Sequence, residues 1–217
     1  MTHNDRIAQL RQDYSAKKLD ITDVHADPIL QFDVWFQEAL QSDTLEPNAM
    51  TLATCTPDGK PSARIVLLKE FTHEGFTFYT NYDSRKGDEI AQNSEVALVF
   101  FWAPLQRQVR IEGTAVMTDR TTAEAYFQSR PKGSQIGAWA SAQSSIIPDR
   151  SILEDNAAAL TTQYAQQEVL PLPPNWGGYC VQPHTIEFWQ GRSSRLHDRL
   201  RYQITADKRW EIARLSP

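Results

Sequence analysis

The chain has 217 residues, of which 41% are hydrophobic and 23% are charged, and its formal net charge is −5. This composition is ordinary for a soluble globular protein with one good hydrophobic core. The acidic balance argues against a general nucleic-acid-binding protein, which is normally basic.

The N-terminal segment is polar and contains acidic residues, unlike a signal or transit peptide. No apolar run approaches the ~18 residues of a membrane-spanning helix. These features predict a cytoplasmic protein without a membrane partner. Residues 4–19 have a weakly apolar helical pattern. We therefore expect residues 1–20 to form a mobile arm and residues 21–217 to form a single domain.

The first strong element is an amphipathic helix over residues 26–41, in which Asp27 can cap the N-terminus and Pro28 fits the first turn. Its helical period places five apolar residues on one side: Ile29, Phe32, Trp35, Phe36 and Leu40.

The hydrophobic period then changes to the alternation that is typical of strands. The strands are predicted at residues 48–56, 61–71, 76–80, 95–103 and 107–117. The first two are joined by the turn "PDGK". A short helix capped by Asp83 or Ser84 interrupts the series. Residues 95–103 are apolar almost throughout, which predicts burial on both faces.

Three helices and a second group of strands follow. The helices are predicted at residues 119–130, 134–141 and 149–167, the last opened by Asp149 or Ser151, and the strands at residues 178–183, 185–191, 195–204 and 209–215. The order is not alternating βαβ, and neither GxGxxG nor GxxxxGK[ST] occurs. We therefore expect a mainly β, α+β fold, with an antiparallel barrel and flanking helices.

The chain has two cysteines, Cys55 and Cys180, both in apolar strand-like runs and far apart in sequence. Their spacing indicates no metal site. We expect two buried, reduced thiols rather than a disulfide.

The stretch "RLHDRLR" carries an unusual set of cations for a predicted strand. Alternation would place four of them on one face: Arg195, His197, Arg199 and Arg201. One interpretation is a solvated edge strand whose arginines prevent unwanted pairing. The other is an anion site, because arginine suits phosphate and histidine can move protons near neutral pH. Arg85 and Lys86 at a predicted helix start permit the same two interpretations, a solvated cap or a phosphate site.

Several ordered motifs carry a family resemblance. They are "RIVLLK", "FYTNYDSRK", "RQVRIEG", "YFQSRPKGSQIGAWAS", "PLPPNWGGY" and "IEFWQGRSSRLHDR", with "LRQDY" near the N-terminus. Together the sequence resembles the pyridoxamine 5′-phosphate oxidase family over nearly the whole chain.

The resemblance implies an FMN-binding split β-barrel of antiparallel Greek-key type and a homodimer with FMN at the subunit interface. It implies oxidation of pyridoxine 5′-phosphate or pyridoxamine 5′-phosphate to pyridoxal 5′-phosphate. Oxygen would be reduced to hydrogen peroxide, and the amine would also release ammonia. No metal is implied. The alternative is a non-catalytic split-barrel protein that binds FMN or pyridoxal phosphate.

The resemblance also implies site residues. For FMN they are Arg64, Ile65, Val66, Leu67, Leu68, Lys69, Tyr79, Thr80, Arg85, Lys86, Gln108, Gln143, Ser144, Trp189 and Arg199. For the substrate they are Arg11, Gln12, Asp13, Tyr14, Lys69, Tyr126, Arg130, Ser134, Arg195, Leu196 and His197. The arm residues 11–14 look like a flexible lid. Arg195 and His197 are the expected catalytic residues, and either could assist proton removal. No family role corresponds to Arg201.

Overall fold

A computed structural model describes residues 4–5, 7, 13–14 and 17–217. The chain divides into two compact units. The first comprises Met1–Ala49, Leu98–Glu112 and His184–Pro217, and the second comprises Met50–Ala97 and Gly113–Pro183. Each unit is described by itself below.

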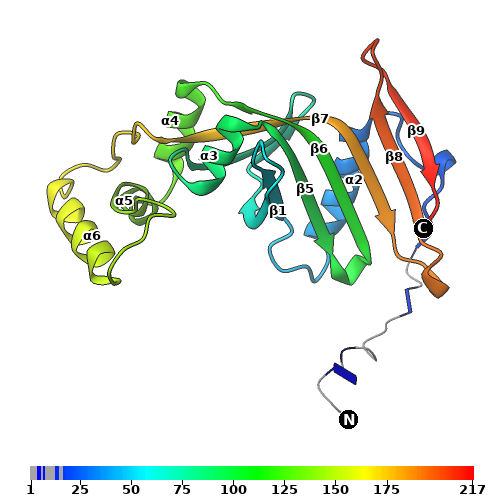
Figure 1. Cartoon of the computed structure of the whole chain (residues 1–217), viewed down its shortest axis with the longest axis horizontal. Coiled ribbons are helices and arrows are strands. Elements are labelled where there is room, and N and C mark those ends of the chain that lie inside the picture. Colours follow the sequence, from blue (N-terminus) through cyan, green and yellow to red (C-terminus); the bar gives the residue numbers. More distant parts are fainter. Residues whose placement is uncertain (1–3, 6, 8–12, 15–16) are drawn as a thin grey trace. The chain divides into compact units, whose positions relative to one another are not determined.

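The first unit contains helix α2 (Pro28–Leu40) and a three-stranded C-terminal ladder. This ladder is antiparallel and joins β7 (Trp176–Gln190), β8 (Asp198–Ile204) and β9 (Trp210–Leu215) (Figure 1). The Asp27 carboxylate accepts a hydrogen bond from the Ile29 N–H at 2.8 Å, which confirms the predicted cap of α2. Aromatic side chains form the core of this unit: Phe32, Trp35, Phe100, Trp102, Phe188 and Tyr202. Leu40, the last residue of the predicted apolar side, lies at the end of the helix and is 53% exposed.

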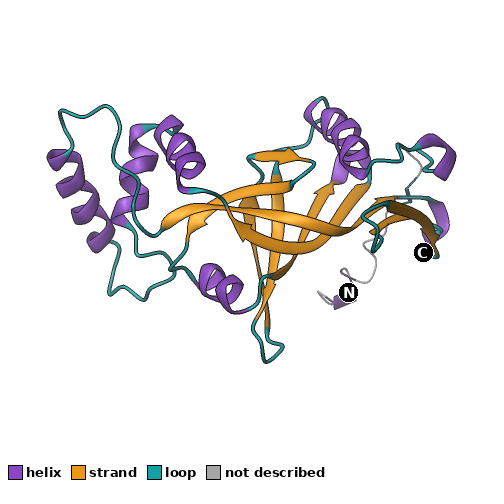
Figure 2. Ribbon diagram, turned by 90° about the horizontal axis from the view of Figure 1, so that it is seen from above, coloured by secondary structure: helices purple, strands orange, loops and turns teal. Residues whose placement is uncertain are grey.

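The second unit combines short antiparallel strands with four helices (Figure 2). Its strands are β1 (Ala49–Cys55), β2 (Pro61–Leu67), β3 (Glu70–Thr72) and β4 (Gly75–Asn81), and its helices are α3 (Arg85–Gln92), α4 (Arg120–Ser129), α5 (Lys132–Ala140) and α6 (Ser151–Gln163). β4 pairs with the first half of β7, from Phe76 opposite Val181 to Asn81 opposite Trp176. A hydrophobic cluster joins α4 and α5 to the start of β7 and the segment before it: Ala123, Phe127, Ile136, Leu170, Leu172 and Trp176.

Strands β5 (Glu95–Trp102), β6 (Arg107–Met117) and β7 contribute residues to both units. The strand order is β2-β1-β5-β6-β7-β4-β3, and β8 and β9 continue from the C-terminal half of β7. The mainly β architecture with flanking helices is therefore confirmed.

Strand β7 corrects one predicted boundary. The sequence predicts two strands, but residues 176–190 form one. β7 pairs with β4 up to Val181 and with β8 from Thr185. Pro183 lies between these two sets of pairs, where the missing N–H of proline costs neither ladder a hydrogen bond.

The strand predicted at residues 195–204 is also shorter in the structure, because β8 begins at Asp198. Ser194 and Arg195 have φ angles of 56° and 61°, which belong to the left-handed region and not to a strand. The prediction that all four cations lie on one strand face is therefore wrong. Only Arg199 and Arg201 share a strand face.

Three further expectations need correction. Among the described residues of the segment 4–19, Asn4, Asp5 and Ile7 are helical as predicted, but Asp13, Tyr14 and residues 17–19 are not. β5 is not buried on both faces, since burial alternates along it and Phe101 is 55% exposed. An apolar run alone therefore does not predict burial on both faces of a strand. Cys55 and Cys180 are unpaired as predicted, but half-buried rather than buried.

Candidate functional site

The second unit contains a cavity of about 740 Å³ between β2, β4 and the segment from α4 to Gln143. Eleven residues that sequence analysis assigned to FMN or substrate line it: Ile65, Val66, Leu67, Lys69, Tyr79, Thr80, Lys86, Tyr126, Arg130, Ser134 and Gln143. The structure thus brings most of the predicted cofactor residues and four predicted substrate residues into one cavity.

Lys86 supplies a buried cation to this cavity. It lies in the first turn of α3 and is 9% exposed. Its Nζ donates hydrogen bonds to the Thr80 hydroxyl at 3.0 Å, the Ser84 hydroxyl at 3.0 Å and the Gln143 amide oxygen at 2.9 Å. All three acceptors are neutral. Burial, reinforced by the charge of Arg64, lowers the pKa of Lys86 to about 8. A buried ammonium without a carboxylate partner favours an anionic ligand.

Arg130 supplies a second cation. It follows α4, and its guanidinium lies 4.8 Å from the centre of the Trp176 ring. Its Nη1 is buried and has no hydrogen-bond partner among the described residues. Burial lowers the pKa of this guanidinium, although no protein pKa shift would discharge an arginine near neutral pH. An unsatisfied guanidinium nitrogen at a cavity wall is suited to a phosphate or carboxylate oxygen.

Three aromatic rings stack at the same cavity. Tyr79 and Tyr126 have centroids 3.9 Å apart with an interplanar angle of 15°, and Trp176 is nearly parallel to both. Burial raises the pKa of Tyr79 to about 12, so its phenol stays protonated at neutral pH. The stack therefore presents flat, uncharged surface beside the two cations.

Four predicted FMN residues of the second unit do not line this cavity. Leu68 is a core residue, 5% exposed. The Arg64 guanidinium is held by Leu52, Thr54, Ser62 and Glu89. Arg85 and Ser144 line a smaller cavity of about 290 Å³, to which Gln143 also contributes.

The other predicted site residues belong to the first unit, where Trp189 and His197 form an aromatic contact with centroids 4.6 Å apart. The Arg192 N–H donates a hydrogen bond to Nδ1 of His197 at 3.1 Å. Burial, reinforced by the charge of Arg195, lowers the pKa of His197. Because Nδ1 accepts the Arg192 N–H, the neutral form of the ring carries its proton on Nε2. Leu196 is 69% exposed, and Gln108 lies on β6.

The predicted arm is described in part. Arg11 and Gln12 lie outside the described residues. The Tyr14 ring lies 5.9 Å from the rings of both Trp189 and His197. Its place depends on Gly191, where an added Cβ would lie 2.8 Å from the Tyr14 ring. The Asp13 carboxylate accepts a hydrogen bond from the Ser194 N–H at 3.3 Å.

The positive charge of Arg199 is compensated by Glu187, a residue that sequence reasoning missed. Nε and Nη2 of Arg199 donate to the two carboxylate oxygens of Glu187 at 2.9 and 3.0 Å. Glu187 is directly opposite Arg201 in the β7–β8 ladder. Glu187 could have been found from the sequence, because it lies two residues before Trp189 and therefore on the same face of the predicted strand. A protein carboxylate, rather than a ligand alone, thus offsets the Arg199 charge, whereas Nε of Arg201 is buried without a partner among the described residues.

The residues that the structure describes contain no group of three His, Cys, Asp or Glu side chains able to hold a metal ion. Over the same residues, no helix has both the length and the apolar character needed to cross a membrane.

Comparisons with known proteins agree with these features. A family model described as "Pyridoxamine 5′-phosphate oxidase" matches residues 36–164, and one described as "Pyridoxine 5′-phosphate oxidase C-terminal dimerisation region" matches residues 176–217. The "Pyridoxine/pyridoxamine 5′-phosphate oxidase" of Acaryochloris marina is 57% identical over 97% of this chain and 95% of its own length. That of Leptospira interrogans is 55% identical over 98% of this chain and 99% of its own length.

Solved structures show the same fold. PhzG from Burkholderia lata 383, in complex with tetrahydrophenazine-1-carboxylic acid, is 32% identical with a TM-score of 0.87, covering 94% of this chain and all of that chain. A pyridoxamine 5′-phosphate oxidase-related, FMN binding protein from Nostoc punctiforme has a TM-score of 0.70 at 17% identity, covering 88% of this chain and 98% of that one. On the matched family models and on relatives that are identical at more than half of the aligned positions, this chain belongs to the pyridoxamine 5′-phosphate oxidase family.

Proposed function

We propose that this protein is an FMN-dependent oxidase that converts pyridoxine 5′-phosphate or pyridoxamine 5′-phosphate to pyridoxal 5′-phosphate. Oxygen is the electron acceptor and is reduced to hydrogen peroxide, and oxidation of the amine also releases ammonia. The reaction serves pyridoxal phosphate biosynthesis and salvage in the cytoplasm. The proposed assembly is a homodimer with FMN at the subunit interface, in line with the dimerisation region matched at residues 176–217.

One observation carries the proposal. A single cavity contains two cations, the buried Lys86 and the half-buried Arg130, whose Nη1 is buried, and neither has an acidic partner among the described residues. Both FMN and the substrate are phosphate monoesters with about two negative charges near neutral pH. Two phosphates would compensate two cations whose burial is otherwise unfavourable.

The residues at Lys86 fit FMN. Thr80 and Gln143 surround the Lys86 ammonium with further polar groups, and Tyr79 and Tyr126 offer a flat apolar surface for a ring system. When bound, FMN supplies the two-electron chemistry, accepting a hydride and passing electrons to oxygen. The chain supplies binding, orientation and charge.

The residues at Arg130 fit the substrate phosphate. Arg130 has a free guanidinium nitrogen, and Lys69, Tyr126 and Ser134 line the same cavity with an ammonium and two hydroxyls. The Arg130 guanidinium also lies 4.8 Å from the centre of the Trp176 ring, and this cation–π contact restrains it at the cavity. These groups would hold the phosphate and leave the pyridine ring to be oriented by other residues.

We assign that orientation to Arg195 and His197. Because Nδ1 of His197 accepts the Arg192 N–H, the neutral imidazole presents Nε2–H as a donor. His197 is therefore proposed to donate a hydrogen bond to the substrate rather than to remove its proton. Arg195 is proposed to hold the pyridine ring of the substrate over the flavin.

The test is a coupled product assay. The protein is purified, reconstituted with FMN and mixed in air with pyridoxine 5′-phosphate, and pyridoxal phosphate and peroxide are followed together. Equal amounts of both products are expected. A bound-flavin spectrum without product from either phosphorylated substrate would instead identify a non-catalytic FMN-binding protein.

A further inference from the structure

Glu89 is the most buried acidic side chain close to the predicted phosphate residues. It lies on α3, four residues after Arg85 and three after Lys86, and is only 4% exposed. It lines the smaller cavity together with Arg85, Gln143 and Ser144. An acid beside a proposed phosphate site would weaken anion binding if charge alone mattered.

Both carboxylate oxygens of Glu89 are occupied. Oε1 accepts a hydrogen bond from Nε of Arg85 at 2.8 Å, and Oε2 accepts one from Nη2 of Arg64 at 3.2 Å. Oε2 also accepts the hydroxyls of Ser62, at 2.5 Å, and Thr54. Burial would raise the pKa of Glu89, but these hydrogen bonds outweigh burial and lower it to about 2. Glu89 is thus ionised throughout the physiological range.

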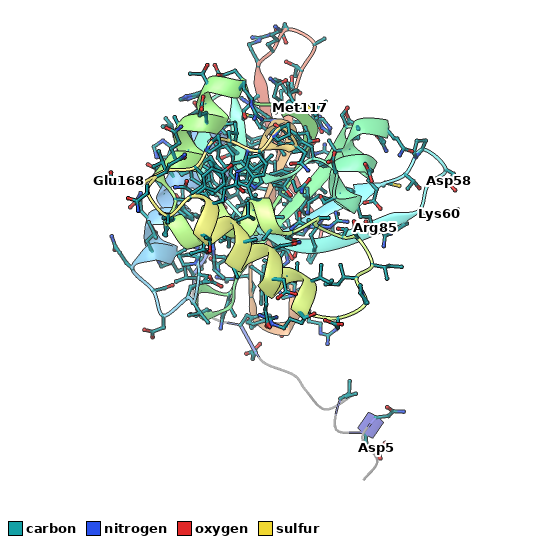
Figure 3. All side chains as sticks on the ribbon, turned by 90° about the vertical axis from the view of Figure 1, so that its left-hand side faces the viewer. Asp5, Asp58, Lys60, Arg85, Met117 and Glu168 are labelled. Atoms are coloured by element: carbon teal, nitrogen blue, oxygen red, sulfur yellow. The ribbon has the colours of Figure 1, made fainter. Side chains whose placement is uncertain are left out.

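The two arginines depend on this carboxylate to different degrees. Arg64 has further acceptors in the Leu52 carbonyl at 3.3 Å and the Thr54 hydroxyl at 2.5 Å. Arg85 lies at the surface (Figure 3), its side chain is 66% exposed, and within the described part of the chain Glu89 is its only partner. Because Glu89 takes Nε, the two terminal nitrogens of Arg85 keep their hydrogens free for a bidentate acceptor.

We propose that Glu89 is a positioning residue for the FMN phosphate: it fixes the guanidinium groups of Arg64 and Arg85 without contacting the phosphate. The inference rests on the proposed function, because it takes FMN to be the ligand. A flexible arginine loses several rotatable bonds on binding, and an anchored one has already lost them. Glu89 therefore strengthens phosphate binding by pre-organisation although its own charge opposes it.

The decisive variant is Glu89→Gln, which removes the negative charge and keeps the side-chain size. A purely electrostatic effect would tighten FMN binding, whereas positioning predicts weaker binding. We expect the FMN dissociation constant to rise about tenfold. This is the change in affinity that corresponds to losing roughly one charge-assisted hydrogen bond. Riboflavin, which lacks the phosphate, should bind within about twofold of its affinity for the unaltered chain. Both constants come from titrating apoprotein into flavin and following flavin fluorescence.

Asp88→Asn is the matched control. Asp88 is the exposed neighbour on the same helix, so this change removes the same charge without disturbing the arginine contacts. FMN binding should be unchanged or slightly tighter. Equal or tighter FMN binding by Glu89→Gln would overturn the inference, and so would equal weakening of FMN and riboflavin, because that pattern indicates general structural damage.

A second variant covers the case in which Glu89→Gln does not fold. Arg85→Lys keeps the charge at an exposed position but removes the Nε–H that Glu89 holds. It should weaken FMN binding and leave riboflavin binding unaltered. Unaltered FMN binding by Arg85→Lys would overturn the inference on its own. Failure of the unaltered chain to bind FMN would overturn the proposed function as well, so the two failures are distinguishable.

Discussion

The ammonium of Lys86 lies 2.9 Å from the amide oxygen of Gln143, and this contact joins the first turn of α3 to the segment after α5 at the cavity wall. The contact is between a buried cation and a neutral dipole. It orients the ammonium but does not neutralise it, so the full positive charge of Lys86 remains available to a phosphate in the cavity.

Replacing Lys86 by Met should therefore weaken FMN binding by about ten- to a hundredfold, the value of a hydrogen bond to a charged group. Flavin fluorescence titration of the apoprotein measures this change. Lys60→Met is the matched control, since Lys60 lies at the exposed tip of the β1–β2 hairpin beside Asp58 (Figure 3). FMN affinity equal to that of the control would refute the assignment of Lys86 to the phosphate.

The same lysine predicts a pH dependence. With a pKa of about 8 in the ligand-free chain, Lys86 loses its proton as the pH rises above this value, and FMN affinity should fall. Lys86→Arg keeps its charge and should flatten the fall in FMN affinity between pH 8 and pH 10.

The stability of the apoprotein should change with pH in the opposite direction to its FMN affinity. The pKa of the folded state is below the ordinary lysine value, so the unfolded chain binds more protons, and the free energy of unfolding of the apoprotein should rise over this range. Urea titrations of unaltered apoprotein and Lys86→Met, compared at each pH, isolate the contribution of Lys86.

These cavity residues show what the sequence could predict. The family motifs assigned Ile65, Val66, Leu67, Lys69, Tyr79 and Lys86 to one ligand, and the structure brings these six residues to one cavity. The local elements were also accessible, because caps and turns such as Asp27 at α2 depend on neighbouring residues.

The partners of the arginines were less accessible. Glu89 joins Arg64 from 25 residues away, and Glu187 joins Arg199 across a hairpin, so both pairings depend on strand register and on tertiary packing. The turn at Ser194 and Arg195 was missed for a related reason. Left-handed backbone at two non-glycine residues contradicts local preference and is imposed by the connection between β7 and β8.

A change at Arg130 should weaken substrate binding and leave FMN binding unaltered. Arg130→Lys keeps the charge but loses the planar guanidinium that lies over Trp176. The KM for pyridoxine 5′-phosphate should rise by about tenfold or more, whereas the FMN dissociation constant should be unchanged. Steady-state kinetics at saturating FMN, with flavin titration alongside, separate the two effects. A loss of FMN affinity with an unaltered KM would place Arg130 at the cofactor instead.

A change at His197 should lower turnover and leave FMN binding unaltered. In His197→Asn the amide oxygen can still accept the Arg192 N–H, but the Nε2–H donor is lost. Turnover per bound flavin should fall by about ten- to a hundredfold, because a substrate held without this donor is less well oriented for hydride transfer. FMN content, read from the flavin absorbance, should equal that of the unaltered protein. His197→Ala, which loses both interactions, should be slower than His197→Asn, since the turn from Arg192 to His197 is then unrestrained as well. If Asn and Ala gave the same turnover as the unaltered enzyme, His197 would have no part in the reaction.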